Sequence, residues 1–322
     1  MRADTPSALT RASRTTLRMG SRGSPLALAQ SREVTAALEA AHPGLRVNLT
    51  VIRTSGDRIQ DIPLATVGGK GLFVKEIEEA LLTGRIEVAV HSIKDLPVLL
   101  PPGLTLGAIT AREEGGDVLV AREAPSLDAL PPGARVGTSS LRRQAQLLHR
   151  RPDLCMVPLR GNVDTRLRKL TEGALDAIVV AAAGLKRLGV RPARAIPLPL
   201  DVSLPAPGQG ALGLEIREAD RATAAIVAVL EDGASRIAVT AERAFLRRLG
   251  GSCNVPIAAY GTVRGDLLTL TGLVASLDGK ALVRDTLTGA ALEAESLGTA
   301  LAECLLAQGA DRILRELAEE TG

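Results

Sequence analysis

Aromatic side chains are nearly absent from this chain. Its 322 residues include no tryptophan, one tyrosine and two phenylalanines. Proteins that bind single-stranded nucleic acids usually stack the bases on such rings. The rings of this chain, Phe73, Phe245 and Tyr260, are too few and too far apart in sequence to build a stacking surface. The composition therefore argues against a nucleic-acid partner.

Cysteines are few, and long hydrophobic runs are missing. Cys155, Cys253 and Cys304 are odd in number and widely spaced, which fits neither a disulfide framework nor a zinc site with close ligand pairs. No apolar run reaches the roughly 20 residues that span a bilayer, and residues 1–14 lack the apolar core of a secretory signal. We expect a cytoplasmic protein without a membrane segment. Residues 1–16 fit either a disordered tail or a targeting segment.

Lysine is also scarce. Only six of the 39 basic residues are lysines, and 36 acidic residues reduce the formal net charge to +3. The planar guanidinium of arginine binds carboxylates bidentately. A preference for arginine also follows from a GC-rich genome, but it is consistent with an acidic ligand.

Two parts of the chain repeat one α/β pattern. A short strand, a glycine, hydroxyl side chains and a helix follow one another in residues 17–40, where Ser24 is placed as the helix N-cap, and again from residue 136. Later, the apolar runs 88–90 and 177–179 follow similar glycine-led segments. These echoes predict two similar lobes with a cleft between them.

The chain crosses between these lobes near residues 110–117 and again through the proline-rich segment 197–210. Two crossings predict a hinged body. After the second crossing, hairpin turns predict a small antiparallel domain. The fold class is therefore α/β, with a discontinuous first lobe, a second lobe and a C-terminal α+β domain, which we assign to residues 17–112 and 211–230, 116–204, and 233–322.

The segment 88–97 (VAVHSIKDLP) places a carboxylate at the end of a buried strand. The apolar residues at its start form the strand, and the proline at its end stops it. Ligands of α/β folds bind beyond the strand ends, so Asp95 is a candidate acid or base, with Lys94 beside it to keep it ionised. The alternative is that Ser92 and Asp95 only satisfy the backbone of a turn.

Residues 140–169 carry eight basic side chains against two acidic ones. Arg142 and Arg143 fall in the first turn of a predicted helix, where the dipole disfavours cations, and an anionic ligand would offset that cost. A hydrogen bond from arginine to a carboxylate is worth roughly 1.5–3 kcal/mol, so several would hold a polyanion. Arg150, Arg151 and Arg168 are better explained as a solvated helix face.

Three residues stand out for their neighbours. Arg22 lies beside the helix start at Ser24, whose free amides attract anions. Lys70, between two glycines, either reaches a ligand carboxylate or is simply solvated. Cys253 lies in a glycine-rich loop with no histidine placed to assist it, which favours covalent attachment of a group over protease-like catalysis. The three histidines lack the spacing of a metal site.

Several long motifs have little chance of occurring together. They are GSRGSPLAL (20–28), VGGKGLFVKE (67–76), AVHSIKDLP (89–97), VGTSSLRRQ (136–144), LRGNV (159–163) and PGQG (207–210). Together they closely resemble the porphobilinogen deaminases, also called hydroxymethylbilane synthases. The likeness runs from about residue 17 to the C-terminus.

This resemblance implies two lobes like those of type II periplasmic binding proteins. It implies that a monomer condenses four porphobilinogen molecules head to tail into hydroxymethylbilane, with release of ammonia. The cofactor would be a dipyrromethane primer joined by a thioether to Cys253, and Asp95 would help ammonia leave and steady the positive pyrrole intermediates. The other implied contacts are Ser92, Lys94, Thr138, Ser139, Arg142 and Arg143 for the cofactor, and Arg22, Ser24, Lys70, Arg160, Arg166, Arg187 and Gln209 for the substrate.

A second hypothesis is a bilobal carboxylate-binding protein without catalysis, which would need neither Asp95 nor Cys253. The chain also departs from the family pattern in two places. Gly251-Ser252-Cys253 replaces the expected Gly-Gly-Cys, and residues 112–117 lack the proline expected at the hinge. Neither departure touches the chemistry, but the stiffness of the hinge stays open.

Overall fold

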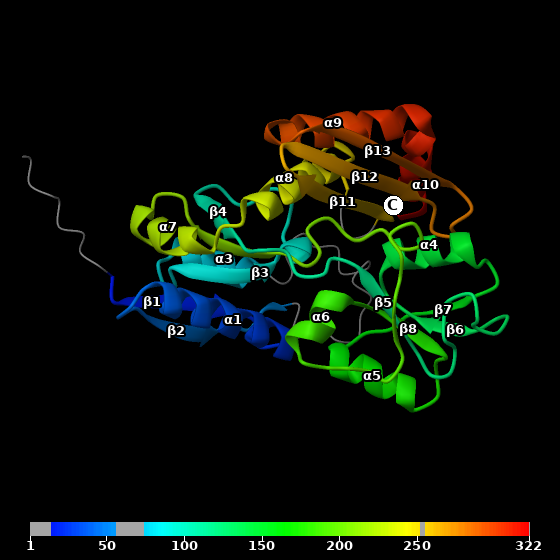
Figure 1. Cartoon of the computed structure of the whole chain (residues 1–322), viewed down its shortest axis with the longest axis horizontal. Helices are drawn as coiled ribbons and strands as arrows, with labels where there is room; N and C mark the ends of the chain where they lie inside the picture. The colour runs from blue at the N-terminus through cyan, green and yellow to red at the C-terminus, as the bar shows by residue number, and fades with distance from the viewer. Residues whose placement is uncertain (1–13, 56–73, 252–254, 322) are drawn as a thin grey trace, which may run out of the picture.

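Three sheets organise the chain. The computed structural model describes residues 14–55, 74–251 and 255–321. Two five-stranded sheets form lobes 1 and 2, and a three-stranded sheet forms the C-terminal domain (Figure 1). The expected α/β class with a C-terminal α+β domain is confirmed. No helix in the described ranges is both long and apolar enough to cross a membrane.

Lobe 1 has the strand order β2-β1-β3-β10-β4. The strand β1 pairs in parallel with β2 and β3, whereas β10 runs antiparallel to both β3 and β4. The strands are β1 (Thr16–Ser21), β2 (Arg46–Val51), β3 (Val88–Ser92), β4 (Leu104–Ile109) and β10 (Leu212–Arg217). The helices packed on them are α1 (Pro25–Ala41), α3 (Lys75–Leu82) and α7 (Arg221–Val227), and a 3-10 turn (Ala228–Leu230) follows α7.

Lobe 2 repeats this arrangement in the order β7-β6-β8-β5-β9. The strand β6 pairs in parallel with β7 and β8, and β5 runs antiparallel to β8 and β9. The strands are β5 (Asp117–Ala121), β6 (Arg135–Gly137), β7 (Cys155–Val157), β8 (Ala177–Ala181) and β9 (Ala195–Pro197). The helices are α4 (Leu141–Arg150), α5 (Val163–Thr171) and α6 (Ala182–Arg187).

The antiparallel strand of each lobe follows a crossing. The strand β5 begins lobe 2 directly after the chain leaves β4, and β10 returns to lobe 1 after β9. Helices α1 and α6 touch where the two lobes meet (Figure 1). The two lobes therefore face each other at these helices, and their shared strand order agrees with the repeat that the sequence echoes predict.

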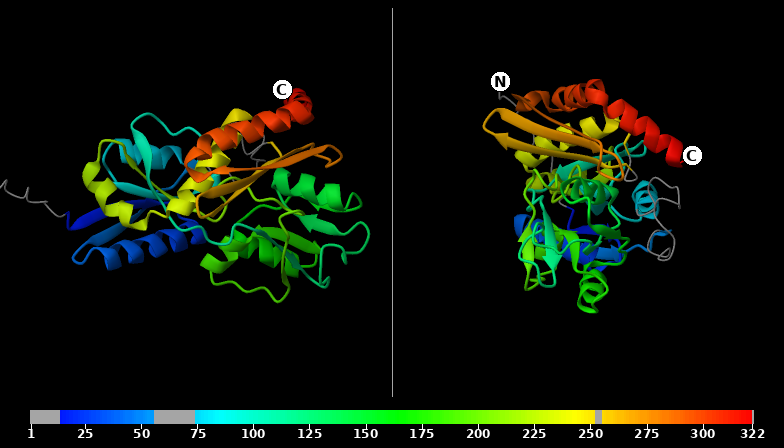
Figure 2. Two further views of the ribbon diagram at one scale, coloured as in Figure 1. Left: turned by 45° about the horizontal axis from the view of Figure 1, so that its top comes forward. Right: turned by 90° about the vertical axis from the view of Figure 1, so that its right-hand side faces the viewer.

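The C-terminal domain packs two long helices on one sheet (Figure 2). The antiparallel strands are β11 (Ile257–Arg264), β12 (Leu267–Ala275) and β13 (Leu282–Ala290). The helices are α8 (Gly233–Arg248), α9 (Ala294–Leu305) and α10 (Asp311–Thr321), with a 3-10 turn (Ala291–Glu293) before α9 and a π turn (Leu306–Ala310) before α10. Phe245 of α8 is fully buried in the shared core.

Local signals set the start of α1 correctly. Ser24 caps α1 by accepting a hydrogen bond from the Ala27 amide at 3.3 Å, and Pro25 is the first helical residue. The strands β5 and β9 were not predicted, because β5 starts within the expected crossing and β9 has only three residues. The residue limits assigned to the three domains stay predictions.

Candidate active site

Asp95 lies at the cleft end of β3. A 3-10 turn (Ile93–Asp95) continues the strand, and the fully buried Ile93 anchors it. Asp95 itself is exposed. It lines a small hollow together with Arg22, Ser24, Gln30 and Ser92. The exposed carboxylate therefore faces a space in which a ligand can sit, while Ser92 accepts a hydrogen bond from Gln30 at 2.8 Å.

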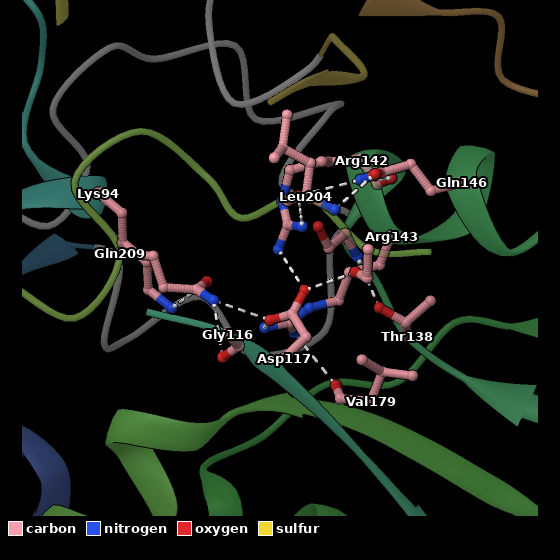
Figure 3. Close-up of polar contacts among 12 residues, drawn as sticks. Lys94, Gly116, Asp117, Thr138, Arg142, Arg143, Gln146, Val179, Leu204 and Gln209 are labelled. Atoms are coloured by element: carbon pink, nitrogen blue, oxygen red, sulfur yellow. Dashed lines mark hydrogen bonds and ion pairs between the residues drawn. The ribbon is translucent and has the colours of Figure 1, made fainter. Parts of the chain in front are cut away.

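A buried carboxylate, Asp117, lies on the lobe 2 side of the cleft (Figure 3). It pairs with Arg142 at 2.9 Å and with Arg143 at 2.7 Å. Ser203 and Gln209 donate two further hydrogen bonds, at 2.9 and 2.8 Å. Burial alone would raise the pKa of Asp117, but the two guanidinium groups hold this pKa well below its usual range. Asp117 is therefore ionised at neutral pH.

This pairing changes the interpretation of the two arginines. The anion that offsets their position in the first turn of α4 is the protein's own Asp117. Arg142 also donates to the carbonyl of Leu204 at 2.5 Å, and Arg143 to that of Val179 at 3.1 Å. Among the described residues, however, Nε of Arg143 is buried and has no hydrogen-bond partner. Contact of either arginine with the cofactor stays a prediction.

Gln209 joins the second crossing to the first (Figure 3). Its Nε2 donates to the carbonyls of Gly115 and Gly116, at 2.7 and 3.2 Å, as well as to Asp117. Its Oε1 accepts a hydrogen bond from Nζ of Lys94 at 3.4 Å. The side chain predicted to touch substrate is thus buried and engaged within the protein.

The ammonium of Lys94 lies among several charges. Burial lowers the pKa of Lys94 to about 8, Asp95 opposes this change, and Arg143 adds to it. Because these charges belong to both lobes, Lys94 lies where the lobes face each other. It is the described cleft cation whose charge changes closest to neutral pH.

Arg166 lies on α5, across the cleft from Asp95. Asn162 caps this helix through the Thr165 amide at 2.9 Å, and Arg166 donates to the Gly161 carbonyl at 2.9 Å. Burial and then Arg143 lower the pKa of Arg166 to about 10, whereas Asp95 raises it. Asp95 and Arg166 are therefore close enough to interact electrostatically. Arg160, just before the cap, is half-buried.

The two hydroxyls at the start of α4 bind their own loops. Ser139 donates to the Leu159 carbonyl at 2.9 Å and accepts from the Leu159 amide at 3.0 Å. Thr138 is buried and accepts from the Ser140 amide at 3.1 Å. These contacts shape the cationic wall of lobe 2, and direct contact of either hydroxyl with a cofactor stays a prediction.

Arg187 ties the lobes together. It contacts Glu33 of α1 at 3.1 Å and donates to the Gly210 carbonyl at 3.0 Å. Its side chain is only 6% exposed. Two other predicted site residues, Lys70 and Cys253, lie outside the described residues.

A second buried carboxylate, Glu242, holds the joint between the domains. Arg112 from the first crossing contacts both of its oxygens at 2.7 Å. The amides of Gly208, from the second crossing, and Gly261, from β11, donate to it at 2.6 and 2.7 Å. The ring of Tyr260 lies 5.0 Å from the Arg112 guanidinium.

Asp117 and Glu242 were missed from sequence. The only signal for Asp117 is an acid placed before the apolar run Val118–Ala121, directly after two glycines. Such an acid looks like part of an exposed hinge until its partners are known.

Comparison with known proteins decides the family. Residues 17–225 match the model of the "Porphobilinogen deaminase, dipyromethane cofactor binding domain", and residues 236–307 match that of the "Porphobilinogen deaminase, C-terminal domain". The porphobilinogen deaminase of Syntrophotalea carbinolica is 59% identical over 301 residues, which are 94% of this chain and 96% of that protein. The chain belongs to the porphobilinogen deaminase family.

Other members of the porphobilinogen deaminase family agree with this assignment. The protein from Geobacter metallireducens is 56% identical over 301 residues, covering 94% of each chain. The activity is therefore that of a porphobilinogen deaminase, or hydroxymethylbilane synthase. Residues 17–225 form the domain that binds the dipyrromethane cofactor.

Solved structures of other proteins resemble the two lobes. The methionine binding protein MetQ has a TM-score of 0.44 at 16% identity, over 67% of this chain and 89% of that chain. The effector binding domain of BenM with benzoate has a TM-score of 0.40 at 15% identity, over 66% and 88%. At these values the likeness concerns the fold alone.

Proposed function

We propose that Asp95 is the carboxylate that assists loss of ammonia in each condensation, and that Arg143, Arg166 and Lys94 hold the acid arms of the pyrrole chain. The observation that carries this proposal is the placement of an exposed carboxylate at the end of β3, opposite a cationic wall from lobe 2. A carboxylate fixed beside a developing cation stabilises it electrostatically, which is usually the largest catalytic contribution.

The residues of the cleft fit a group that carries several carboxylates. Burial lowers the pKa of Lys94 to about 8 and that of Arg166 to about 10, so both side chains still carry a positive charge at neutral pH. An anion in the cleft would pair with both cations and raise their pKa values again. When bound, the dipyrromethane cofactor supplies the pyrrole carbon to which the first substrate is joined.

Asp117 has a supporting role in this scheme. It fixes Arg142 and Arg143 against the end of β5, so that these side chains do not need to be ordered by the ligand. Preorganised groups lose less entropy on binding. One carboxylate against two guanidinium groups leaves this trio with a net positive charge, to which Lys94 and Arg166 add.

The cofactor attachment is tested on the purified protein. We propose a thioether between Cys253 and the dipyrromethane primer, on which four porphobilinogen molecules are joined. Ehrlich's reagent should colour the denatured protein, and the peptide containing Cys253 should carry the excess mass of two pyrrole rings. No colour and an unmodified peptide would instead favour a bilobal carboxylate-binding protein. We further propose that the enzyme is a cytoplasmic monomer, which sedimentation at several concentrations would test.

A further inference from the structure

A second cavity lies where α8 of the C-terminal domain packs against β4 of lobe 1. Its volume is about 180 Å³, and a cavity of roughly 150 Å³ is large enough to hold benzene. None of its described lining residues also lines the hollow that contains Asp95. The cavity is therefore a space separate from the candidate active site.

Part of the cavity lining is apolar. Val98 and Ile109 of lobe 1 and Val239 of α8 contribute to this surface. Ile109 and Val239 are each 1% exposed, and they belong to the same core cluster as Ile93, which anchors the turn of Asp95. A molecule in the cavity would therefore rest on the packing that supports the Asp95 segment.

The rest of the lining is polar and mostly cationic. Four residues spaced by three or four positions share one face of α8, and they are Arg236, Thr240, Arg243 and Arg247. Two of them have acidic partners, because Arg236 pairs with Glu231 at 2.6 Å and Arg247 pairs with Glu295 at 2.5 Å. Glu295 is the only acidic side chain among the described lining residues. The polar surface therefore carries an excess of positive charge.

Arg243 carries this excess charge, since it forms no salt bridge within the described chain. Its Nη2 donates to the carbonyls of Pro97 and Val98, each at 2.8 Å, whereas its Nε and Nη1 donate to no described residue. Burial and then Arg247 lower the pKa of Arg243, and Glu215, which lies beyond salt-bridge distance, opposes this change. Charges taken out of water normally have a partner of opposite sign. An anion is the partner that Arg243 lacks.

Thr240 offers a second donor beside Arg243. It precedes Arg243 by three positions, so the two side chains are neighbours on the helix surface. Its hydroxyl makes no hydrogen bond with a described residue, and the side chain is half-buried in the lining of the cavity. A carboxylate has two acceptor oxygens, which a hydroxyl and a guanidinium can share.

We propose that this cavity binds a small organic carboxylate, whose anionic group accepts hydrogen bonds from Arg243 and Thr240 while its apolar body lies against Val98 and Val239. Inorganic phosphate would satisfy the donors but leave the apolar lining uncovered, so an organic ligand fits better. Because Nη2 of Arg243 keeps its two carbonyl partners, the bound molecule links α8 to the segment that carries Asp95. This site does not depend on the reaction proposed for the cleft.

The test uses 4-fluorobenzoate, whose ring and carboxylate match the two kinds of lining. Binding to the purified holoenzyme is followed by ¹⁹F NMR titration. Thr240→Val should weaken binding about tenfold, because a hydrogen bond to a charged group is lost. Glu295→Gln should tighten binding about fivefold, because the acidic side chain of the lining is removed. Neutral 4-fluorobenzamide should bind at least about tenfold more weakly than the acid, because its pairing with Arg243 is lost.

Two control variants separate this site from other cations of the protein. Arg248 also lies on α8, but it pairs with Glu303 at 2.6 Å and does not line the cavity. Arg248→Gln should therefore bind the probe as wild type does. Arg166→Gln removes a cation of the cleft and should likewise leave the affinity unchanged. Inorganic phosphate, added as a competitor, should displace the probe only at a higher concentration than unlabelled benzoate.

Four outcomes would overturn the proposal. The first is the absence of saturable binding, and the second is equal affinity in wild type, Thr240→Val and Glu295→Gln. The third is loss of binding in Arg166→Gln, which would place the probe in the cleft. The fourth is displacement by phosphate at a lower concentration than by benzoate, which would indicate a site for inorganic anions. If Thr240→Val does not fold, Glu295→Gln still provides the comparison, since the Glu295 side chain is 63% exposed.

Discussion

The two lobes share one sheet order, yet the groups that surround the buried carboxylate of each lobe differ. Strand β5 of lobe 2 and β10 of lobe 1 occupy equivalent positions, and each carries a fully buried carboxylate. Asp117 on β5 receives hydrogen bonds from four side chains. Glu215 on β10 receives none from the described residues and faces His91 instead. A buried carboxylate is thus surrounded by hydrogen-bond donors in lobe 2, whereas in lobe 1 it lies against a single imidazole.

The residues that follow equivalent strands also differ between the two lobes. β3 of lobe 1 runs into Lys94 and Asp95, whereas the equivalent β8 of lobe 2 runs into the alanine-rich start of α6. Lobe 1 therefore supplies the exposed acid, and lobe 2 supplies the wall of arginines. A shared fold sets where the strands end but not which chemistry stands there.

The largest expected effect on stability follows from removing Asp117, the buried carboxylate of lobe 2. Asp117→Ala leaves Arg142 and Arg143 buried without their anion, so the free energy of unfolding should fall by about 3–5 kcal/mol. Urea denaturation measures this change. The control is Asp128→Ala, which removes an exposed pair with Arg150 and should cost less than about 1 kcal/mol. Equal losses in the two variants would contradict the anchoring role.

The pH dependence of unfolding also tests whether the ionised form of Asp117 stabilises the fold. Because the folded-state pKa of Asp117 is lowered, its stabilising contribution is complete above the unfolded pKa of about 3.9 and is lost as the pH falls toward the folded value. Wild type should therefore lose stability progressively below about pH 4, and Asp117→Asn should lose less over that range. Parallel curves for the two proteins would argue against this assignment.

The next effect concerns the exposed carboxylate of lobe 1. Asp95→Asn should lower kcat by about 10²–10³, or about 2.7–4 kcal/mol, because it removes a preorganised charge from the transition state. The unfolding curve should not change, since Asp95 is exposed. Rates from release of ammonia and urea curves test both parts. The exposed Asp164 of α5 provides the control variant Asp164→Asn, and wild-type turnover in Asp95→Asn would exclude the acid from the mechanism.

A smaller effect concerns Lys94, which lies between the lobes. Since its pKa is lowered to about 8, KM for porphobilinogen should rise as the pH passes through that value and the ammonium is lost. Lys94→Met should raise KM about tenfold at pH 7, which corresponds to one charge-assisted hydrogen bond, and should remove the dependence near pH 8. Steady-state kinetics between pH 7 and 9 distinguish this from a flat profile, which would exclude Lys94 from substrate binding.

The smallest effect comes from exposed cations of lobe 2. Arg168 pairs with Glu172 at 2.5 Å on the outer side of α5, and both side chains are more than half exposed. Arg168→Gln should change the free energy of unfolding by about 0.3–0.5 kcal/mol and leave KM unchanged. Weaker substrate binding in this variant would show that the cationic wall extends beyond the cleft.

The sequence predicts what local chemistry determines. The cap at Ser24, the strand that delivers Asp95 and the hairpins of the C-terminal domain follow from short-range rules. The partner of Arg142 and Arg143 does not, because Asp117 is separated from them by 25 and 26 positions and comes from another strand. The contact of Arg187 with Glu33 on the opposite lobe is equally hidden from local sequence, and contact of Arg187 with substrate stays a prediction.

The joint at Glu242 has a consequence for how the molecule moves. Both crossings and β11 are bonded to this one side chain. A rotation of the two lobes relative to each other would therefore leave the crossings fixed on the C-terminal domain. The C-terminal domain, which carries Glu242, is part of this fixed joint. Widening of the cleft to admit a longer product would then displace the cationic wall relative to Asp95 and leave the third domain almost still.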